Sequence, residues 1–477
     1  MENEDFVNKY ATAIIDGNAA VFAGAGLSME QGFVDWKTLL MPFAKQIQID
    51  LNRETDLVSI AQYYVNENRG QRGEMFDEIL KQFSKTPASS SSSMGVLARL
   101  PISTYWTTNY DDQIESALRN LNKIVDVKRS EKNLAHNVPK RDAVIYKMHG
   151  DVNNVEQTVL TKSDYELYDS NYPMFRTTLK ADLLSQKFLF IGFSFEDPNI
   201  EYVLSEIHGI LGNGQSSHYG IFKNIQQLKG EADKDFEYRK LKFTLKLHDL
   251  TRYGIKPVLV DDYSKIPELL QRVERKIMRR NVFISGSMSK TLDKDANNQW
   301  KHSDGLKLAK TLASEIVKAD KKIITGFGLG IGSAVIEGAL SEIHATKPNH
   351  LSDYLDMFPF PQESDSAHRK AIWTQYRKDI LKDAGIVIIL FGEKLLNGKH
   401  VVANGVLEEY KLAYDAGKVI IPIGSTGWAA AKKFEESIKE LRNRMDLTPE
   451  QVKILQQSLD ISELVKVIME IIERLQM

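Results

Sequence analysis

The sequence predicts an α/β protein of two domains, each with a parallel sheet flanked by helices. An apolar run, a glycine-rich turn and a helical pattern follow one another at residues 19–36, and this succession returns at 281–290 and 322–338. Short apolar segments alternate with amphipathic ones between these points, which is typical of parallel sheets covered by helices. A chain of 477 residues is also too long for one ordinary core.

The first half of the chain holds six short apolar segments that we expect to be buried strands. They are Ala20–Phe22, Ser103–Thr107, Ala143–Lys147, Phe188–Ile191, His218–Phe222 and Lys256–Leu259. Amphipathic helices are expected at Ile200–Leu211 and Tyr263–Ile277. The serine run Ser89–Ser93 is interpreted as a flexible loop or as the entry to a helix.

The second half repeats the pattern. Its strands are expected at Val282–Ser285, Lys322–Thr325, Gly385–Leu390 and Val419–Ile423. Its helices are expected at Ser303–Ala319, Ala334–His344, Ala371–Asp383, Gly405–Ala416 and Ile461–Leu475. The basic stretch Arg275–Arg280 precedes the first of these strands, so we place the boundary there, giving domains 1–279 and 280–477. The stretch also fits the basic last turn of a helix, and both interpretations can hold.

The composition is that of a globular cytoplasmic protein. Hydrophobic residues make up 42% and charged residues 26%, and a net charge of −2 gives no broad basic surface for nucleic acid. No cysteine occurs, so disulfides and thiolate zinc sites are impossible, and no metal is expected. The acidic, polar start is unlike a signal peptide, and apolar runs such as Ala384–Phe391 are too short to cross a membrane. We therefore expect a cytoplasmic location and no membrane or nucleic-acid partner.

Two glycine turns in the first domain follow strands. The first turn is Gly24–Ser28 (GAGLS). The backbone N–H groups of such a turn can approach a phosphate at the start of the helix that follows. Many glycine turns only close a loop, and that alternative stays open. The second turn follows Ile191 and offers Ser194 and Asp197 to ribose hydroxyls. An ordinary loop with an acidic helix cap is its alternative.

Three polar side chains follow two other strands. Asn109 and Asp111 are two residues apart on an extended segment, so they point the same way and could fix an amide ligand and a water together. An Asx turn is the simpler explanation of this pair. His149 reaches the carboxyl edge of the sheet, where open α/β sheets bind ligands, and can act there as a general base. A structural role is more frequent for a lone histidine.

The motifs GAGLS, TTNYD, KMHGD and GFSFEDPN, in this order, resemble the sirtuin superfamily. The resemblance implies that NAD is the substrate. It implies that Asn109 orients the reacting ribose or water, that Asp111 holds the nicotinamide carboxamide and that His149 is the general base. The residues that it implies for binding the rest of NAD are Ala23, Gly24, Ala25, Gly26, Ser28, Asp35, Ser194 and Asp197.

The chain departs from sirtuin deacylases in two respects. It cannot build their four-cysteine zinc module, and Trp36-Lys37 follows Asp35 where they carry an arginine. Water is therefore the simpler acceptor, and the resemblance indicates hydrolysis of NAD to nicotinamide and ADP-ribose. A protein deacylase and a nucleotide-binding scaffold without turnover are the alternatives.

The second domain contains a strand that runs into four glycines in Thr325–Ser333 (TGFGLGIGS). Four glycines are unfavourable to order unless the backbone must approach something, so a phosphate cradle is favoured over a flexible hinge. Arg377 can pair with a pyrophosphate, although it also fits a solvated surface arginine. Glu409, in NGVLEE, can accept hydrogen bonds from a ribose or base, or compensate the dipole of its helix.

The motifs FISGS, TGFGLGIGS and NGVLEE resemble the SLOG superfamily of Rossmann-like domains, which bind or process nucleotides. The absence of a glycine-rich threonine pattern at Gly405–Glu409 disfavours a phosphoribohydrolase. A sirtuin-like domain followed by a SLOG domain is similar to the NADase effectors of bacterial Thoeris antiphage defence. That resemblance implies a homotetramer, activated by a cyclic ADP-ribose isomer from a TIR-domain partner enzyme. The residues that it implies for binding this signal are Gly286, Ser287, Leu329, Phe360, Arg377, Lys394, Gly405 and Glu409.

Overall fold

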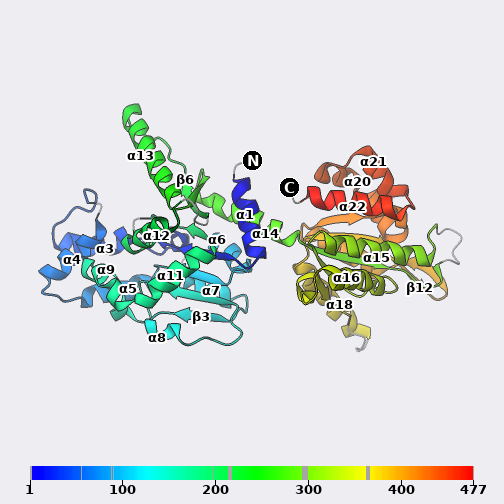
Figure 1. Ribbon diagram of the computed structural model, residues 1–477, viewed down its shortest axis with the longest axis horizontal. Helices are drawn as coiled ribbons and strands as arrows, with labels where there is room; N and C mark the ends of the chain where they lie inside the picture. Colours follow the sequence, from blue (N-terminus) through cyan, green and yellow to red (C-terminus); the bar gives the residue numbers. More distant parts are fainter. Residues whose placement is uncertain are drawn as a thin grey trace. The chain divides into compact units, whose positions relative to one another are not determined.

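The computed structural model of the chain (Figure 1) describes residues 3–54, 56–87, 89, 91–195, 197–212, 217–292, 299–360 and 366–475. The chain divides into two compact units, residues 1–274 and 275–477. Helix α14 (Ile266–Met278) contains the point of division. The domain boundary expected between residues 279 and 280 remains a prediction.

The first unit is built on a seven-stranded, all-parallel sheet in the order β3-β4-β2-β1-β5-β6-β7. All five residues of β1 are buried, as expected for a strand covered on both faces. Strand β1 is also where the order reverses, because β2 pairs with one edge of it and β5 with the other. A crevice for ligands opens at the carboxyl ends of strands at such a reversal. The strands are β1 (Ala19–Ala23), β2 (Thr104–Thr107), β3 (Val125–Lys128), β4 (Ala143–Lys147), β5 (Lys187–Ile191), β6 (His218–Lys223) and β7 (Ile255–Val260).

Helices surround this sheet, and three of them form a lobe of their own. Helices α3, α4 and α5 share a small apolar core that includes Phe43, Tyr64 and Met75, and they lie together in the blue part of Figure 1. The helices of the first unit are α1 (Glu4–Ile15), α2 (Ala25–Met29), α3 (Trp36–Gln46), α4 (Leu57–Glu67), α5 (Gly73–Phe83), α6 (Ser92–Arg99), α7 (Gln113–Arg119), α8 (Glu131–Leu134), α9 (Lys162–Glu166), α10 (Tyr168–Asn171), α11 (Pro173–Ser185), α12 (Pro198–Leu211), α13 (Asp233–Arg252) and α14.

The second unit is a five-stranded parallel sheet in the order β10-β9-β8-β11-β14, with a separate antiparallel hairpin β12-β13. Its strands are β8 (Asn281–Ser287), β9 (Lys322–Thr325), β10 (Leu355–Met357), β11 (Ile386–Phe391), β12 (Glu393–Leu396), β13 (Lys399–Val402) and β14 (Val419–Pro422). Its helices are α15 (His302–Lys318), α16 (Gly332–Thr346), α17 (Leu351–Tyr354), α18 (Ser366–Lys382), α19 (Asn404–Asp415), α20 (Trp428–Met445), α21 (Pro449–Gln457) and α22 (Ile461–Arg474).

The predicted fold class is confirmed: two α/β units carry parallel sheets flanked by helices. The ten expected strands are all present, because apolar runs buried on both faces are easy to recognise. Strand β3 was not expected, because its sequence Val-Asp-Val-Lys alternates over only four residues. Helix α13 was also missed, because only Leu247 and Leu250 of its twenty residues are buried and no apolar stripe marks it.

The serine run proves to be a helix entry. Ser91 accepts a hydrogen bond from the N–H of Met94 and caps α6, while Ser90 lies outside the described residues. In the part of the chain that the structure describes, no helix is long and apolar enough to traverse a bilayer.

Helix α22 provides a test of the second core. Ile468 is fully buried within the core of the second unit, whereas Lys466 on the same helix is exposed. We expect Ile468→Ala to lower the free energy of unfolding of this unit by about 2–5 kcal/mol, because it leaves a cavity in a packed core. Lys466→Ala should change the free energy by less than about 0.5 kcal/mol. Urea unfolding followed by circular dichroism measures both, and equal effects would contradict the packing described.

Candidate active site

A cavity of about 510 Å³ opens in the first unit where the strand order reverses. Its lining brings together the segments that follow four strands, β1, β2, β4 and β5, and the lobe of α3, α4 and α5. The lining residues are Ala25, Gly26, Ser28, Val34, Asp35, Trp36, Lys37, Leu39, Asp56, Leu57, Val58, Phe83, Thr108, Asn109, Tyr110, Asp111, His149, Tyr165, Gly192, Phe193, Ser194, Asp197 and Pro198.

The floor of the cavity is formed by two glycine turns packed backbone to backbone. Gly24 N–H donates to Ile191 O at 2.9 Å, and Gly26 N–H donates to Gly192 O at 2.9 Å. A Cβ atom on Gly24 would lie 2.3 Å from Gly192 O, so a larger residue does not fit there. The N–H groups of Gly24 and Gly26, expected to face a phosphate, are thus hydrogen-bonded within the protein. Ala25, Gly26 and Ser28 line the cavity, whereas Ala23 and Gly24 are buried behind its wall.

Asn109 is fixed against the first glycine turn. Its Nδ2 donates to Gly24 O at 3.0 Å and to Ser28 Oγ at 3.2 Å. Its side-chain oxygen, Oδ1, is buried and has no hydrogen-bond partner among the described residues. A buried acceptor left unpaired is unfavourable, so Oδ1 is available to a hydroxyl or a water in the cavity.

Asp111 lies in the same wall, with 4% of its surface exposed. Burial raises the pKa of this carboxyl above its ordinary value, and the charge of Lys147 opposes that shift. Its Oδ1 accepts a hydrogen bond from Gln113 N–H at 3.1 Å, which is the Asx turn that the sequence left open. The Lys147 ammonium group donates to the backbone oxygen of Asp111 and lies 3.4 Å from the buried Glu115 carboxylate.

His149 faces the cavity from the loop after β4. Burial lowers the pKa of this imidazole, and the carboxylates of Asp197 and Asp164 oppose that shift. Its Nε2 lies 3.2 Å from Asp197 Oδ2, but the angles are not those of a hydrogen bond. The ring packs edge-on against Tyr165, with the centroids 5.4 Å apart. Burial therefore favours a neutral imidazole, the form that accepts a proton.

The remaining predicted NAD-binding residues lie around the rim. Asp35 Oδ1 accepts from Thr38 N–H at 2.8 Å and caps α3. Asp197 Oδ1 accepts from Asn199 N–H at 2.9 Å and caps α12, the alternative that the sequence left open. Ser194 is exposed at the second glycine turn. All three residues line the cavity, so capping and ligand contact are compatible.

The sequence did not identify the apolar wall of the cavity. The lobe and the loops beside it contribute aromatic and aliphatic side chains, namely Val34, Trp36, Leu39, Leu57, Val58, Phe83, Tyr110, Tyr165 and Phe193. Apolar residues on amphipathic helices are expected to be core, so no pattern in the sequence distinguishes them. Tyr110 and Phe193 lie within the motifs TTNYD and GFSFEDPN, and Trp36 follows Asp35, but none of the three was predicted to line a site.

In the second unit, four of the predicted signal-binding residues meet around one guanidinium group. Arg377 Nε donates to Glu409 Oε1 at 3.2 Å, and its guanidinium lies over the Phe360 ring with 4.9 Å to the centroid. A Cβ atom on Gly405 would lie 2.8 Å from Arg377 Nη2. Burial raises the pKa of Glu409, and Ser285, which donates to its Oε2 at 2.6 Å, opposes the shift.

The other four predicted residues lie at the end of β8, in the glycine run after β9 and on β12. Met288 N–H donates to Leu329 O at 2.9 Å, and a Cβ atom on Gly328 would lie 2.1 Å from Gly286 O. Ser287 Oγ donates to the backbone oxygen of Glu393 at 2.8 Å, at the start of the hairpin that carries Lys394. The glycine run thus packs on the turn after β8, as the first glycine turn packs on its neighbour.

Comparisons with known proteins cover nearly the whole chain. The profile of the Sir2- and TIR-associating SLOG family matches residues 265–475, and that of the SIR2-like domain matches residues 103–244. The chain is 40% identical over 475 residues to the NAD(+) hydrolase ThsA of Bacillus cereus (strain MSX-D12), covering 98% of each chain. It is 42% identical over 444 residues to the NAD(+) hydrolase ThsA of Cytobacillus dafuensis, covering 92% of this chain and 88% of that one.

A third relative agrees with these two. The NAD(+) hydrolase ThsA of Acinetobacter baumannii (strain 532279) is 40% identical over 449 residues, which covers 92% of this chain and 91% of that one. The identity extends across both units in all three comparisons, and the two domain profiles occur in the expected order. The chain therefore belongs to the ThsA family.

Proposed function

We propose that the first unit hydrolyses NAD to nicotinamide and ADP-ribose, and that a nucleotide bound to the second unit activates it in antiphage defence in the bacterial cytoplasm. The observation that carries this proposal is that Asn109, Asp111 and His149 line one cavity beside the two glycine turns. Membership of a family whose named members are NAD(+) hydrolases supports the same reaction.

In this reaction the bond between the nicotinamide nitrogen and ribose C1′ breaks, and its electron pair stays on nicotinamide, which leaves neutral. The ribose passes through an oxocarbenium-like state. A water oxygen bonds to C1′, and the proton that it loses goes to the neutral imidazole of His149. The products are nicotinamide and ADP-ribose, and the proton passes from His149 to solvent.

Asn109 and Asp111 complete this site in the proposal. The unpaired Oδ1 of Asn109 accepts a hydrogen bond from the attacking water or a ribose hydroxyl. Asp111 holds the nicotinamide carboxamide, and the apolar wall with Trp36 and Phe83 excludes bulk water around the reacting ribose. The rest of NAD lies over Ala25, Gly26 and Ser28, towards Ser194 and Asp197 at the second turn.

Activation is proposed to follow from differential binding of a cyclic ADP-ribose isomer, made by a TIR-domain enzyme, to the second unit of a homotetramer. A shift from about 1% to about 99% active enzyme requires the ligand to prefer the active state by about 5.5 kcal/mol. Arg377 and Lys394 would contact the phosphates of this ligand. The contacts of Arg377 with Glu409 and the Phe360 ring support the first of these roles, because they hold the guanidinium in one orientation.

The role of His149 gives the first test of this proposal. We expect His149→Ala to lower kcat for nicotinamide release by at least about 100-fold, because general-base catalysis contributes about 10²–10⁴-fold. The exposed His136 provides the control, and His136→Ala should retain full turnover. Nicotinamide release is followed by chromatography. A His149→Ala protein that turns over NAD like the parent would disprove the assignment.

The dependence of turnover on pH gives a second test. His149 can accept a proton only while its imidazole is neutral. Because burial lowers the pKa of this imidazole from its ordinary value of about 6.5, kcat/KM should fall only when the pH drops below about 6.5. Asp197→Asn keeps a capping side chain and removes a carboxylate that opposes this lowering. The acidic limb of its profile should therefore move to lower pH. Movement to higher pH would contradict the proposed electrostatics.

Signal binding provides a third test. Arg377→Lys keeps a positive charge beside the buried Glu409 but removes the planar fork of donors. We expect about 10-fold weaker binding of a cyclic ADP-ribose isomer, measured by calorimetry, because charge-assisted hydrogen bonds contribute about 1.5–3 kcal/mol. Lys378→Ala, exposed on the same helix, is the control. Equal affinities for the two variants would place the signal elsewhere.

A further inference from the structure

A short extended segment links the two loops that carry the proposed catalytic residues. We call residues 158–161 the strap. Val159 N–H donates to the backbone oxygen of His149 at 3.0 Å, and the hydroxyl of Tyr110, the neighbour of Asn109, donates to Val159 O at 2.8 Å. Val159 and Leu160 are buried. The strap is therefore bonded to the loop of His149 on one side and to the loop of Asn109 on the other.

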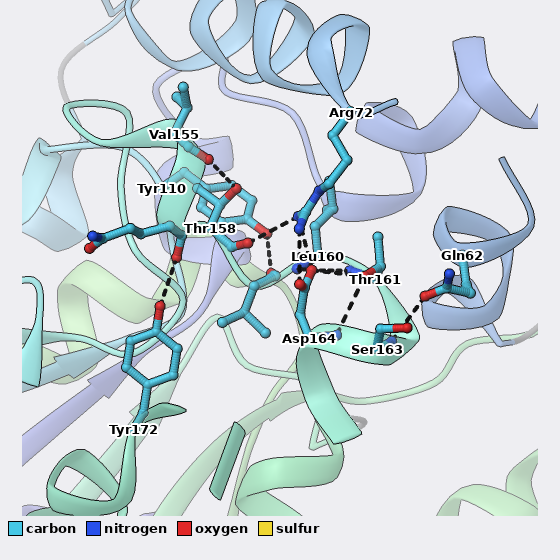
Figure 2. Close-up of polar contacts among 12 residues, drawn as sticks. Gln62, Arg72, Tyr110, Val155, Thr158, Leu160, Thr161, Ser163, Asp164 and Tyr172 are labelled. Atoms are coloured by element: carbon cyan, nitrogen blue, oxygen red, sulfur yellow. Dashed lines mark hydrogen bonds and ion pairs between the residues drawn. The ribbon is translucent and has the colours of Figure 1, made fainter. Parts of the chain in front are cut away.

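The chain also approaches the His149 loop closely just before the strap. Gly150 has φ +75°, and a Cβ atom there would lie 2.9 Å from Gln157 O. The hydroxyl of Tyr172 donates to the same Gln157 oxygen at 3.2 Å (Figure 2). A displacement of this segment would therefore be transmitted directly to the turn that follows His149.

Arg72 at the start of α5 reaches the strap from outside (Figure 2). Its Nη1 and Nη2 donate to the two carboxylate oxygens of Asp164, both at 2.9 Å. Nη2 also donates to Thr158 O at 3.2 Å. One guanidinium group thus holds the first residue of the strap and the helix turn that follows its last residue.

Asp164 completes the connection from the other end. Its Oδ2 accepts from Leu160 N–H at 3.0 Å, from Thr161 N–H at 2.8 Å and from Thr161 Oγ1 at 2.9 Å. The Thr161 side chain caps α9 in return, so the carboxylate belongs to a capping box as well as to an ion pair. Every contact of this carboxylate with the strap is lost if its side chain turns away.

The pair differs from an ordinary surface ion pair in geometry and burial. Exposed pairs contribute little, but a bidentate arginine–carboxylate pair fixes direction as well as distance. The side chains of Arg72 and Asp164 are 23% and 20% exposed. Neither residue lines the cavity, so neither can touch the substrate, and their hydrogen bonds reach the site through the strap.

We propose that Arg72 and Asp164 clamp the strap, and that the clamped strap positions His149 and Asn109 for reaction. The inference rests on the proposed role of His149 in the reaction. Arg72 and Asp164 act as positioning residues, since they touch the strap and not the substrate. A displacement of a reacting group by about 1 Å can lower the rate by about 100-fold, so a loosened strap affects turnover more than binding.

The test compares Arg72→Met with Arg239→Met, because Arg239 also forms a bidentate pair with a carboxylate and donates to a backbone oxygen. Arg239 donates to both carboxylate oxygens of Glu231 at 2.8 Å and to Gln226 O at 2.7 Å, and it does not line the cavity. Arg239→Met therefore removes the same kinds of bond from the same unit. Turnover of NAD, the pH profile and peptide-resolved hydrogen exchange are measured on the full chain for both variants.

We expect Arg72→Met to lower kcat by at least about 10-fold with KM changed by less than about 3-fold. Amide hydrogens in 149–161 and 109–111 should exchange faster than in the parent, while Arg239→Met leaves both segments and kcat unchanged. Unaltered exchange in 149–161, or a loss of kcat no larger than that of Arg239→Met, would overturn the proposal.

Two further variants keep the test decisive if Arg72→Met does not fold. Arg72→Lys keeps the charge but not the fork, and Asp164→Asn keeps a capping side chain but not the charge. Asp164→Asn also removes one of the two carboxylates that oppose the lowering of the His149 pKa, the other being Asp197. The acidic limb of the kcat/KM profile of Asp164→Asn should therefore move to lower pH. Tyr165 and Tyr168, which pack against the His149 ring, stay neutral because burial raises the pKa of both phenols.

The outcomes separate this inference from the proposed function. An active His149→Ala protein would remove the catalytic role of that residue, whatever Arg72→Met does. Faster exchange of the strap in Arg72→Met would still establish the clamp in that case. Conversely, an inactive His149→Ala protein with unaltered strap exchange in Arg72→Met would keep the proposed base and reject the clamp.

Discussion

The backbone contact between the two glycine turns is the constraint on which the rest of the cavity depends. Gly192 O excludes a Cβ atom on Gly24, and Leu27 N excludes one on Gly192. The amides of Gly24 and Gly26 donate to the last residue of β5 and to the turn after it. The Asn109 side chain is held by Gly24 O, so its orientation follows from this contact. Because β1 and β5 are neighbours, the turns after them can meet only at the point where the strand order reverses.

A close backbone contact between two turns also occurs in the second unit, and it changes how the glycine-rich turns are interpreted. Gly330 is excluded from carrying a side chain by Met288 O, at 1.9 Å from its Cβ position. From the sequence, we expected the glycines of both units to be places where a ligand approaches the backbone. In the structure, another turn of the same protein makes the closest approach, and the residues of the first turn that line the cavity are Ala25, Gly26 and Ser28. A glycine pattern therefore locates the crevice better than it identifies the atoms that bind within it.

What could be predicted from the sequence follows the same division between local and distant contacts. The buried strands are continuous apolar runs, and Asn109, Asp111 and His149 directly follow such runs, so their place at one sheet edge could be predicted. The apolar wall could not be, because Trp36 and Phe83 come from a lobe whose helices look like any amphipathic helix. The pair of Arg72 and Asp164 is 92 residues apart in sequence, and no local pattern connects a helix start with a distant capping box.

Buried polar contacts also hold the proposed catalytic loops in place. Lys147 is fully buried and donates to the backbone of Asp111, with the carboxylates of Glu115 and Asp151 nearby at 3.4 and 3.8 Å. Leaving one member of such a group unpaired costs about 3–5 kcal/mol, so each loop is held in one position as long as all members are present. Charged groups have directional requirements that an apolar core lacks, and they tolerate fewer alternative arrangements. In the proposed reaction the cavity aligns a water, a ribose and an imidazole, and loops anchored by charge suit that task, beside a wall that needs only to be apolar.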